Sequence, residues 1–379
     1  MNRVKILDVL RGFSLFGLLL VHLPIFGISD FLVSDQFNPN MSLLHNTAFF
    51  LYYVFCDGRF FPIFAFLFGY GFAIQLVGKV GTNPNIFLRR LFGLALIGLV
   101  HNVLFFNGDI LFSYACIGLL FFFLRKSSDN SLIFMMTIAM ICTMITYYFF
   151  GDYKPTGLEI QNQINSLKKV NELNFLDSVV SRMNSASMVF GFILLFNWPI
   201  SIAMFCLGFL LGRKNFFQSE NPFSQIPSWL IVVSFIITIT SALALTLYNV
   251  FGFSKAILMG LFGVTAPLLS FIYIFLIQRY FSVYPNLLMF CYLSKVGRMS
   301  LTIYLFESIF MGILFQAWGF SLFDKFDLYT IMSFSIPMFF FFIVFAEVWF
   351  HFFEIGPFEW LLRMVSYLEI PHSDLPKHN

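Results

Sequence analysis

Long apolar segments separated by short polar stretches follow one another along almost the whole chain. A nearly uninterrupted apolar run of about 18 or more residues is typical of a membrane-spanning helix, because in hydrocarbon the backbone must satisfy its own hydrogen bonds. Spans are predicted at about 10–29, 58–78, 86–106, 108–124, 132–150, 187–212, 226–248, 256–278, 299–319 and 329–352. A shorter apolar stretch at 43–56 is expected to be re-entrant or interfacial. The pattern predicts an all-α, polytopic helical bundle with about ten transmembrane helices, a single membrane domain over residues 1–379.

Two polar segments interrupt this pattern. Residues 151–185 form a mixed-charge insertion in which LEIQNQINSLKKVNELNFLDSVV has apolar residues at helical spacing, as in an amphipathic helix lying on a membrane surface. The tail 356–379 begins with GPFEWLLRMVSYLEI, which has the same character. We expect the insertion to be extracytoplasmic and the tail to be cytoplasmic.

Composition supports a lipid environment. The chain is 59% hydrophobic and 11% charged, whereas an ordinary soluble domain carries about 25% charged residues. The five cysteines contain no CxxC pair, so neither a disulfide framework nor a metal site is predicted. A net charge of +3 is too small to indicate nucleic acid. The first apolar segment lacks a cleavage site and begins with charged residues, so it is expected to be a retained helix.

The placement of basic residues predicts the orientation, because short cytoplasmic loops are enriched in Lys and Arg. With the amino terminus inside, the cytoplasmic side receives Arg3, Lys5, Lys79, Arg89, Arg90, Arg125, Lys126, Arg213, Lys214, Arg279, Lys295, Arg298, Arg363 and Lys377. Both termini are therefore expected to be cytoplasmic, in a multi-pass protein of the cell (inner) membrane.

The first span contains ionisable residues, which are costly in lipid and are functional candidates by default. In LDVLRGFSLFGLLLVH, Arg11 and His22 lie eleven residues apart and so share one helical face. Asp8 lies one turn before Arg11 and can pair with it. On spacing alone a structural reading is favoured: Asp8 and Arg11 as an interfacial anchor, and His22 as a hydrogen-bonded packing residue.

A second polar group opens the second span, in CDGRFFPIFAFLFGYGF. Asp57 and Arg59 are expected to form an ion pair or to take part in catalysis. Gly69 and Gly71 are expected to allow close helix packing.

The third group lies in the predicted hairpin LRRLFGLALIGLVHNVLFFNGDILFSYACIGLL. Asp109 opens a helix, where a carboxylate can cap free amides. In the predicted topology His22, His45, Asp57, His101 and Asp109 all fall near the outer side, while Arg89 and Arg90 lie at the inner end. Separate packing explanations would not predict this convergence.

Carboxylates also occur in the last two spans. Ser300, Tyr304 and Glu307 share one helical face, and Glu307 and Glu347 are predicted to be buried. Such carboxylates should be protonated, paired or in contact with a wet cavity. The chain has no P-loop, GxSxG, HExxH or Rossmann glycine motif.

Over nearly its full length the sequence resembles the YeiB-like family of multi-pass bacterial membrane proteins. The resemblance rests on LDVLRGFSLFGLLLVH, DGRFFPIFAFLFGYGFAIQL, LRRLFGLALIGLVH, GDILFSYACIGLL, KVGRMSLTIYLFES and GPFEWLLR. That family is in turn similar to transmembrane acyltransferases, including O-antigen acetylases and heparan-alpha-glucosaminide N-acetyltransferase. Arg11 and His22 match the acetylases' arginine, ten residues and histidine, and His45 is nearest to the histidine of the heparan enzymes.

The resemblance implies an acyltransferase that takes an acyl (acetyl) group from cytoplasmic acyl-CoA, without a metal, to a small-molecule or glycan acceptor outside. The nucleotide phosphates are expected near Arg89, Arg90 and Arg298, with Arg11 at the inner mouth. His22 is favoured as general base and His45 is second, while His101 is a further candidate. Asp57 or Asp109 would orient the base.

Two other functions remain open at this point. A transporter or flippase would use His22, Glu307 and Glu347 within the bundle, and a helix break near Asn197 and Pro199 fits that reading. A non-catalytic scaffold would use the polar residues only to hold helices together. The sequence does not predict the oligomeric state.

Overall fold

The computed structural model describes residues 4–29, 41–77, 83–151, 153, 156–218, 227–247 and 252–368. Every regular element within these residues is a helix. The α-helices are α1 (Lys5–Gly27), α3 (Leu43–Phe55), α4 (Phe60–Val77), α5 (Pro84–Leu104), α6 (Leu111–Phe123), α7 (Asp129–Gly151), α8 (Gly157–Asn171), α9 (Phe175–Phe192), α10 (Trp198–Arg213), α11 (Ser228–Thr246), α13 (Lys255–Val283), α14 (Leu288–Arg298), α15 (Ser300–Phe315), α16 (Leu328–Ser333), α17 (Ser335–Phe352) and α18 (Pro357–Tyr367).

The apolar helices confirm a polytopic, all-α membrane protein. In the described part of the chain eight helical segments are long and apolar enough to cross a bilayer: Lys5–Gly27, Leu43–Val77, Pro84–Leu104, Asp129–Gly151, Phe175–Arg213, Ser228–Thr246, Lys255–Val283 and Leu328–Phe352. The pair α14 and α15, bent by 83°, is a ninth candidate. All ten predicted spans coincide with helices. The one predicted at 108–124 is α6, which has only 13 residues.

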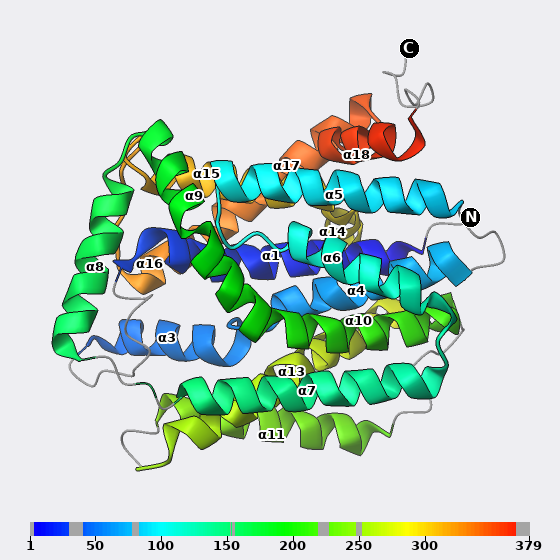
Figure 1. Ribbon diagram of the computed structural model, residues 1–379, viewed down its shortest axis with the longest axis horizontal. Coiled ribbons are helices and arrows are strands. Elements are labelled where there is room, and N and C mark those ends of the chain that lie inside the picture. Colours follow the sequence, from blue (N-terminus) through cyan, green and yellow to red (C-terminus); the bar gives the residue numbers. More distant parts are fainter. Residues whose placement is uncertain are drawn as a thin grey trace.

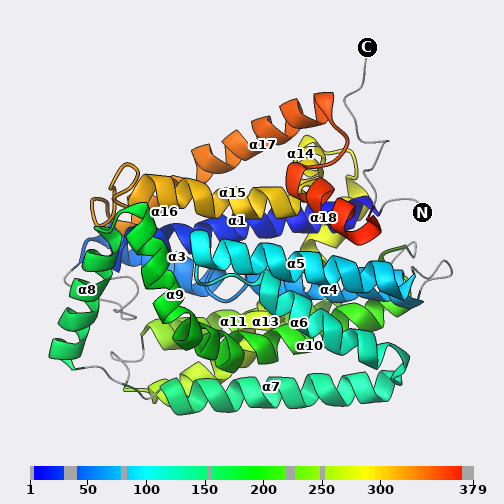
Figure 2. The same ribbon diagram turned by 45° about the horizontal axis from the view of Figure 1, so that its top comes forward.

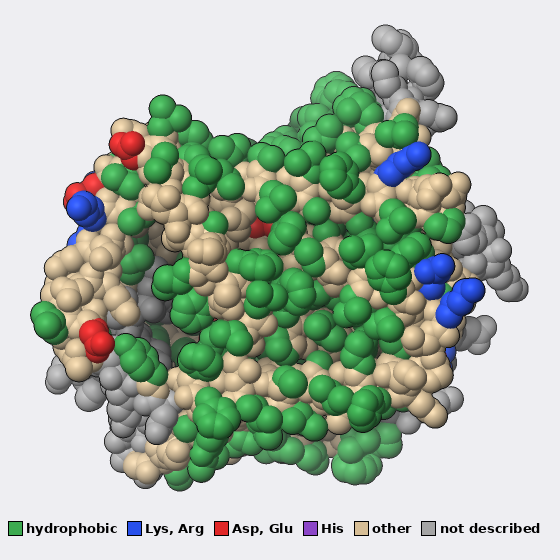
Figure 3. Space-filling model, viewed as in Figure 1, with side chains coloured by type: hydrophobic (Ala, Val, Ile, Leu, Met, Phe, Trp, Pro, Cys, Tyr) green, Lys and Arg blue, Asp and Glu red, His purple; other side chains and the backbone are tan. Residues whose placement is uncertain are grey.

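The long helices run roughly side by side (Figures 1 and 2). The ends that carry the predicted cytoplasmic loops lie together, at the end where α1 and α5 begin and where α18 lies; we call this the basic end. On the face shown in Figure 3, Lys and Arg side chains stand alone at the basic end, whereas both signs of charge occur at the opposite end. The arrangement agrees with the predicted alternation of the spans.

Glycines set the closest helix contacts. A Cβ on Gly69 of α4 would lie 2.3 Å from the carbonyl oxygen of Phe205 in α10, and one on Gly297 of α14 would lie 1.9 Å from that of Asp8 in α1. The prediction of close packing is therefore confirmed for Gly69. It is wrong for Gly71, which has no atom within 4 Å of its Cβ position and instead lines a cavity.

Both polar segments contain helices, as predicted. Within the insertion, α8 begins with a reciprocal cap between Thr156 and Glu159 and lies at the opposite end of the bundle. Within the tail, α18 packs against α5 at the basic end, and it is not among the candidate spans. The amphipathic pattern identified two helices that border the bundle rather than cross it.

Two irregular turns break the long apolar segments. Residues 56–59 separate α3 from α4, and Gly58 adopts φ +70°, a conformation that favours glycine. A π-helical turn, Ile193–Asn197, joins α9 to α10 without ending the helical segment, so the structure has a change of helix type near Asn197 and Pro199 where a break was predicted. Backbone groups freed by such breaks must find other partners in lipid.

Candidate functional site

A cavity of about 540 Å³ enters the bundle at the basic end, between α1, α4, α5, α6, α15 and α18. Its mouth carries four guanidinium groups, from Arg11, Arg90, Arg298 and Arg363, which we call the basic mouth. Asp8, Glu354 and Glu359 line the same region. Its volume is within the usual range for a small-molecule site.

Beyond the mouth, the cavity wall becomes apolar. Leu18, Phe64, Leu67, Phe68 and Leu94 line this part, and Ile110, Leu111, Tyr114 and Tyr304 line the part next to the α5–α6 turn. The cavity therefore joins a cationic surface to the buried interior near Tyr304.

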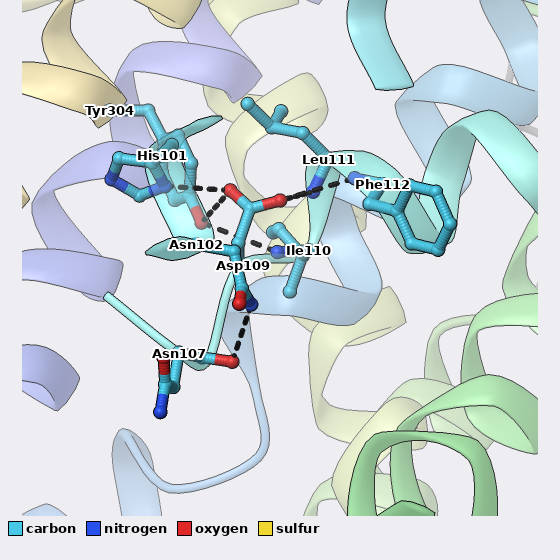
Figure 4. Close-up of polar contacts among 8 residues, drawn as sticks. All are labelled: His101, Asn102, Asn107, Asp109, Ile110, Leu111, Phe112 and Tyr304. Carbon is cyan, nitrogen blue, oxygen red and sulfur yellow. Dashed lines mark hydrogen bonds and ion pairs between the residues drawn. The ribbon is translucent and has the colours of Figure 1, made fainter. Parts of the chain in front are cut away.

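Behind Tyr304 lies a buried cluster of three polar residues, His101, Asp109 and Tyr304, which we call the buried triad (Figure 4). His101 Nδ1 lies 2.8 Å from Asp109 Oδ2, and the Tyr304 hydroxyl donates to the same oxygen at 3.3 Å. His101 is only 3% exposed. Because the carboxylate accepts, Nδ1 carries the proton and Nε2 presents its lone pair.

The α5–α6 turn fixes the position of this triad. Asp109 Oδ1 accepts from the backbone amides of Leu111 at 2.9 Å and Phe112 at 3.1 Å, so Asp109 caps the amino end of α6 as predicted. Arg182 of α9 donates to the last carbonyls of α5, those of Val103 at 2.9 Å and Leu104 at 2.7 Å. Arg182 of α9 thus fixes the end of α5, the helix that carries His101.

His22 lies next to this triad. Its ring is 5.0 Å from the ring of Phe106, and it lies within electrostatic range of His101. Among the described residues, His22 Nδ1 and His101 Nε2 are buried without a hydrogen-bond partner, as is the carboxyl group of Glu307. Buried polar atoms are normally satisfied, so such a group indicates a place for water or a ligand.

Two arginines of the basic mouth have defined contacts. Arg11 pairs with Asp8 at 2.8 Å, which confirms the predicted i, i+3 contact. Arg298 donates to the backbone oxygen of Glu354 at 3.1 Å and stacks on Phe350.

Glu359 of α18 is fully engaged. Its carboxyl group accepts from the backbone amide of Leu301 at 2.7 Å and from the Thr302 hydroxyl at 2.6 Å, at the start of α15. Burial raises the pKa of this carboxyl above its ordinary value, and the hydrogen bonds from Thr302 and Leu301 oppose the rise.

The structure separates the other sequence candidates from this cavity. His45 lies in the first turn of α3, where its backbone amide is capped by Ser42. Asp57 lies in the α3–α4 turn, and Arg89 is exposed on α5, outside the cavity lining. Of the predicted residues, His22, His101 and Asp109 come together at one end of the cavity, and Arg11, Arg90 and Arg298 come together at the other.

Two expected ionic features are wrong. Arg59 binds the backbone oxygens of Asp57 and Tyr53, and no ion pair joins the side chains of Asp57 and Arg59 in the described structure. Glu347 is not buried, because its side chain is 48% exposed and pairs with Lys295. Helical spacing alone did not indicate which side of α17 faces outward.

Sequence reasoning did not identify Arg363, Arg182 or the role of Tyr304. Tyr304 was predicted to share a face with Ser300 and Glu307, but nothing in the spacing indicated that Asp109 lies beside it. Arg363 was assigned only to the tail. The signal available for Arg363 was its position on the polar side of an amphipathic segment next to a membrane surface.

The fold and the site define a multi-pass α-helical membrane protein with a basic cavity leading to a buried His–Asp–Tyr cluster. Residues 211–369 match the family described as "Protein of unknown function (DUF418)". The chain is 26% identical to "Uncharacterized protein YxaH" of Bacillus subtilis (strain 168), covering 97% of this chain and 95% of the relative. It is 24% identical to "Uncharacterized protein YeiB" of Escherichia coli (strain K12), covering 97% of each chain.

These comparisons confirm the resemblance to the YeiB-like family over almost the whole chain. The relatives' names state no activity. No solved structure matches the chain. The cavity and the buried triad are therefore the features of this chain that bear on its function.

Proposed function

We propose that the protein is a membrane-bound acyltransferase that moves an acyl (acetyl) group from cytoplasmic acyl-CoA to an acceptor hydroxyl or amine on the outer side. The observation that carries this proposal is a continuous cavity that leads from the basic mouth to Tyr304, directly in front of Asp109 and His101. A long donor with a phosphorylated head and an apolar arm suits such a shape.

The proposed chemistry uses His101 as general base. Nε2 removes the proton from the acceptor hydroxyl or amine, and the acceptor oxygen or nitrogen forms a bond to the acyl carbon. The carbon–sulfur bond of the thioester breaks, and the departing thiolate of coenzyme A takes the proton from Nε2. Asp109 holds the required tautomer and stabilises the imidazolium in the transition state, as the third member of a triad does.

His101 is preferred to His22 for a geometric reason. His101 has a carboxylate partner at 2.8 Å, whereas His22 has none in the described structure. Tyr304 stands between the cavity and His101, so the acyl group reaches Nε2 when the phenol ring moves aside. His22, next to Phe106, lies outside the cavity lining but within electrostatic range of His101, where we propose that it contacts the acceptor.

The test is transfer of labelled acetyl groups in proteoliposomes, with acetyl-CoA on one side and a panel of monosaccharides and amino sugars on the other. Replacing His101 with Gln should lower turnover by about 10²-fold or more, because a positioned base contributes about 10² to 10⁴. Asp109→Asn should lower it as well, with little change in KM for acetyl-CoA.

The matched control is His351→Gln, since His351 is exposed on α17. Its turnover should equal that of the wild type. Equal turnover in His101→Gln and His351→Gln would refute the assignment of the base, and no transfer to any acceptor or to water would count against the proposed activity itself.

A transporter is the second candidate, and the broken helices favour it. The α3–α4 turn and the 83° bend between α14 and α15 both interrupt apolar segments, and interrupted spans often border transport sites. The buried, unpartnered carboxyl of Glu307 also suits a proton carrier. Proton-coupled solute uptake that is lost in Glu307→Gln, without acyl transfer in the wild type, would support this alternative.

A further inference from the structure

Three arginines from three helices meet at the basic mouth. Arg90 of α5 lies within electrostatic range of Arg11 of α1 and of Arg363 of α18, and all three line the cavity. Like charges gathered in a partly buried place repel each other, and the repulsion is relieved when an anion lies between them.

The acidic groups nearby do not supply that anion to Arg90. Asp8 pairs with Arg11, and Glu359 is bound to the first amides of α15. The side chain of Glu354 does not contact Arg90 in the described structure. Arg90 itself makes no hydrogen bond or ion pair with any described residue, although its side chain is half-buried and faces the cavity.

The carboxyl-terminal helix completes this group of charges. Leu362, Arg363, Ser366 and Tyr367 of α18 all line the cavity. Leu362 also packs closely on α5, where its Cδ1 lies 2.9 Å from the Cβ position of Gly93. The position of Arg363 over the mouth therefore depends on how α18 docks on α5 and α15.

We propose that the basic mouth is a binding site for a phosphate-bearing ligand, that Arg11, Arg90 and Arg363 bind the phosphate together, and that ligand binding and docking of α18 reinforce each other. This inference extends the proposed function to the ligand site, and rests on that function only for the identity of coenzyme A as the natural ligand. Phosphate fits because guanidinium groups bind it through paired, charge-assisted hydrogen bonds.

Coupling follows from the geometry. Without the ligand, Arg363 approaches Arg90 as a like charge and opposes docking of α18. With a phosphate between them, the same two side chains draw α18 onto α5. Glu359 holds α18 to the start of α15 in both states, so the helix remains close enough for the ligand to close the site.

The experiment measures binding of coenzyme A and of inorganic pyrophosphate to the full-length protein in phosphatidylcholine nanodiscs by calorimetry. Both probes should bind, and binding should slow hydrogen exchange in residues 357–367. Arg90→Gln and Arg363→Gln should each raise Kd about tenfold or more, because each removes a charge-assisted contact. The Kd of Arg90→Lys should lie between those of the wild type and Arg90→Gln, since lysine keeps the charge but not the paired hydrogen-bond geometry.

Arg89→Gln is the matched control, because the neighbouring Arg89 makes the same change in net charge but is exposed outside the cavity. Its Kd should stay within about twofold of the wild type. Equal weakening by Arg89→Gln and Arg90→Gln would overturn the inference, as would unchanged exchange in α18 when the probes bind.

A second arm distinguishes a soluble ligand from a lipid headgroup. Nanodiscs containing phosphatidylglycerol should bind both probes as tightly as neutral nanodiscs if the ligand is soluble. If the probes instead bind more weakly in the anionic nanodiscs than in the neutral ones, and Arg90→Gln removes this difference, the site is assigned to a phospholipid headgroup. If Arg90→Gln changes neither the Kd of the soluble probes nor the effect of phosphatidylglycerol on that Kd, the inference is wrong. Since pyrophosphate carries no acyl group, its binding is measured whether or not the protein transfers acyl groups.

Discussion

Arg59 shows how a single buried side chain makes a break in a membrane helix possible. Its side chain is 0% exposed and donates to the freed backbone oxygens of Asp57 and Tyr53, while its guanidinium stacks 4.4 Å from the centre of the Phe262 ring. From α13, Tyr273 donates to the oxygen of Phe55 at 2.9 Å. These side chains supply the hydrogen bonds that the α3–α4 turn cannot make for itself.

Replacing Arg59 with Met should therefore destabilise the protein. Methionine fills similar space but leaves the oxygens of Asp57 and Tyr53 without a donor, so the free energy of unfolding should fall by about 2 kcal/mol or more. Unfolding in mixed micelles with increasing SDS measures the change. Arg279→Met, at an exposed arginine of α13, is the control and should unfold like the wild type; equal stability of the two variants would contradict this role for Arg59.

At the residue scale, sequence reasoning succeeded where a contact is local in the chain. The Asp8–Arg11 pair and the Asp109 cap follow from spacings of two or three residues. The Tyr304–Asp109 contact joins residues 195 positions apart, and the Arg182 bonds join α9 to the end of α5. Contacts of this kind depend on how whole helices pack, so a single sequence does not specify them.

At the element scale, α4 and α10 depend on small residues for their close approach. Gly69 meets the backbone of Phe205, and Gly208 meets that of Phe66, where a Cβ would lie 2.0 Å from the carbonyl oxygen. Neither backbone can move without shifting its helix. The apolar pattern predicted where these helices lie, but only their packing distinguishes a glycine at a contact from one at a cavity.

The glycines of α4 provide a comparison within one helix. Gly69→Ala should lower the free energy of unfolding by about 1 to 3 kcal/mol, because the added methyl group forces α4 away from α10. Gly71→Ala has no atom within 4 Å of the new carbon and should be neutral or stabilising by up to about 1 kcal/mol, since alanine favours the helix. SDS unfolding of both variants checks this, and an equal change in stability in the two variants would contradict the role given to the contact between Gly69 and Phe205.

At the scale of the whole molecule, charge and apolarity together predicted the arrangement of the spans. The ten apolar segments predicted from sequence coincide with helices, and the helix ends next to the basic loops lie together at one end of the bundle. The helix lengths differ more than the pattern suggested, because α6 is short while Phe175–Arg213 continues for 39 residues through the π-helical turn.

The predicted orientation can be tested with two single cysteines in a variant lacking the native ones. Gln163→Cys on the exposed face of α8 should react with a membrane-impermeant maleimide in intact cells, because α8 lies at the end opposite the basic loops. Arg89→Cys, at the basic end, should react only after the membrane is permeabilised. The reverse pattern would mean that the basic end faces outward.

The cavity ends at Tyr304, deep within the bundle, and this affects how the protein responds to the membrane potential. Water in the cavity from the basic end to Tyr304 would screen the electric field far better than lipid, so the potential difference would fall mainly across the layer beyond Tyr304. A charge that moves across this layer changes in energy by up to about 2.3 kcal/mol per 100 mV. Proton movement at His101, just behind Tyr304, would therefore be coupled to the voltage of the energised cell.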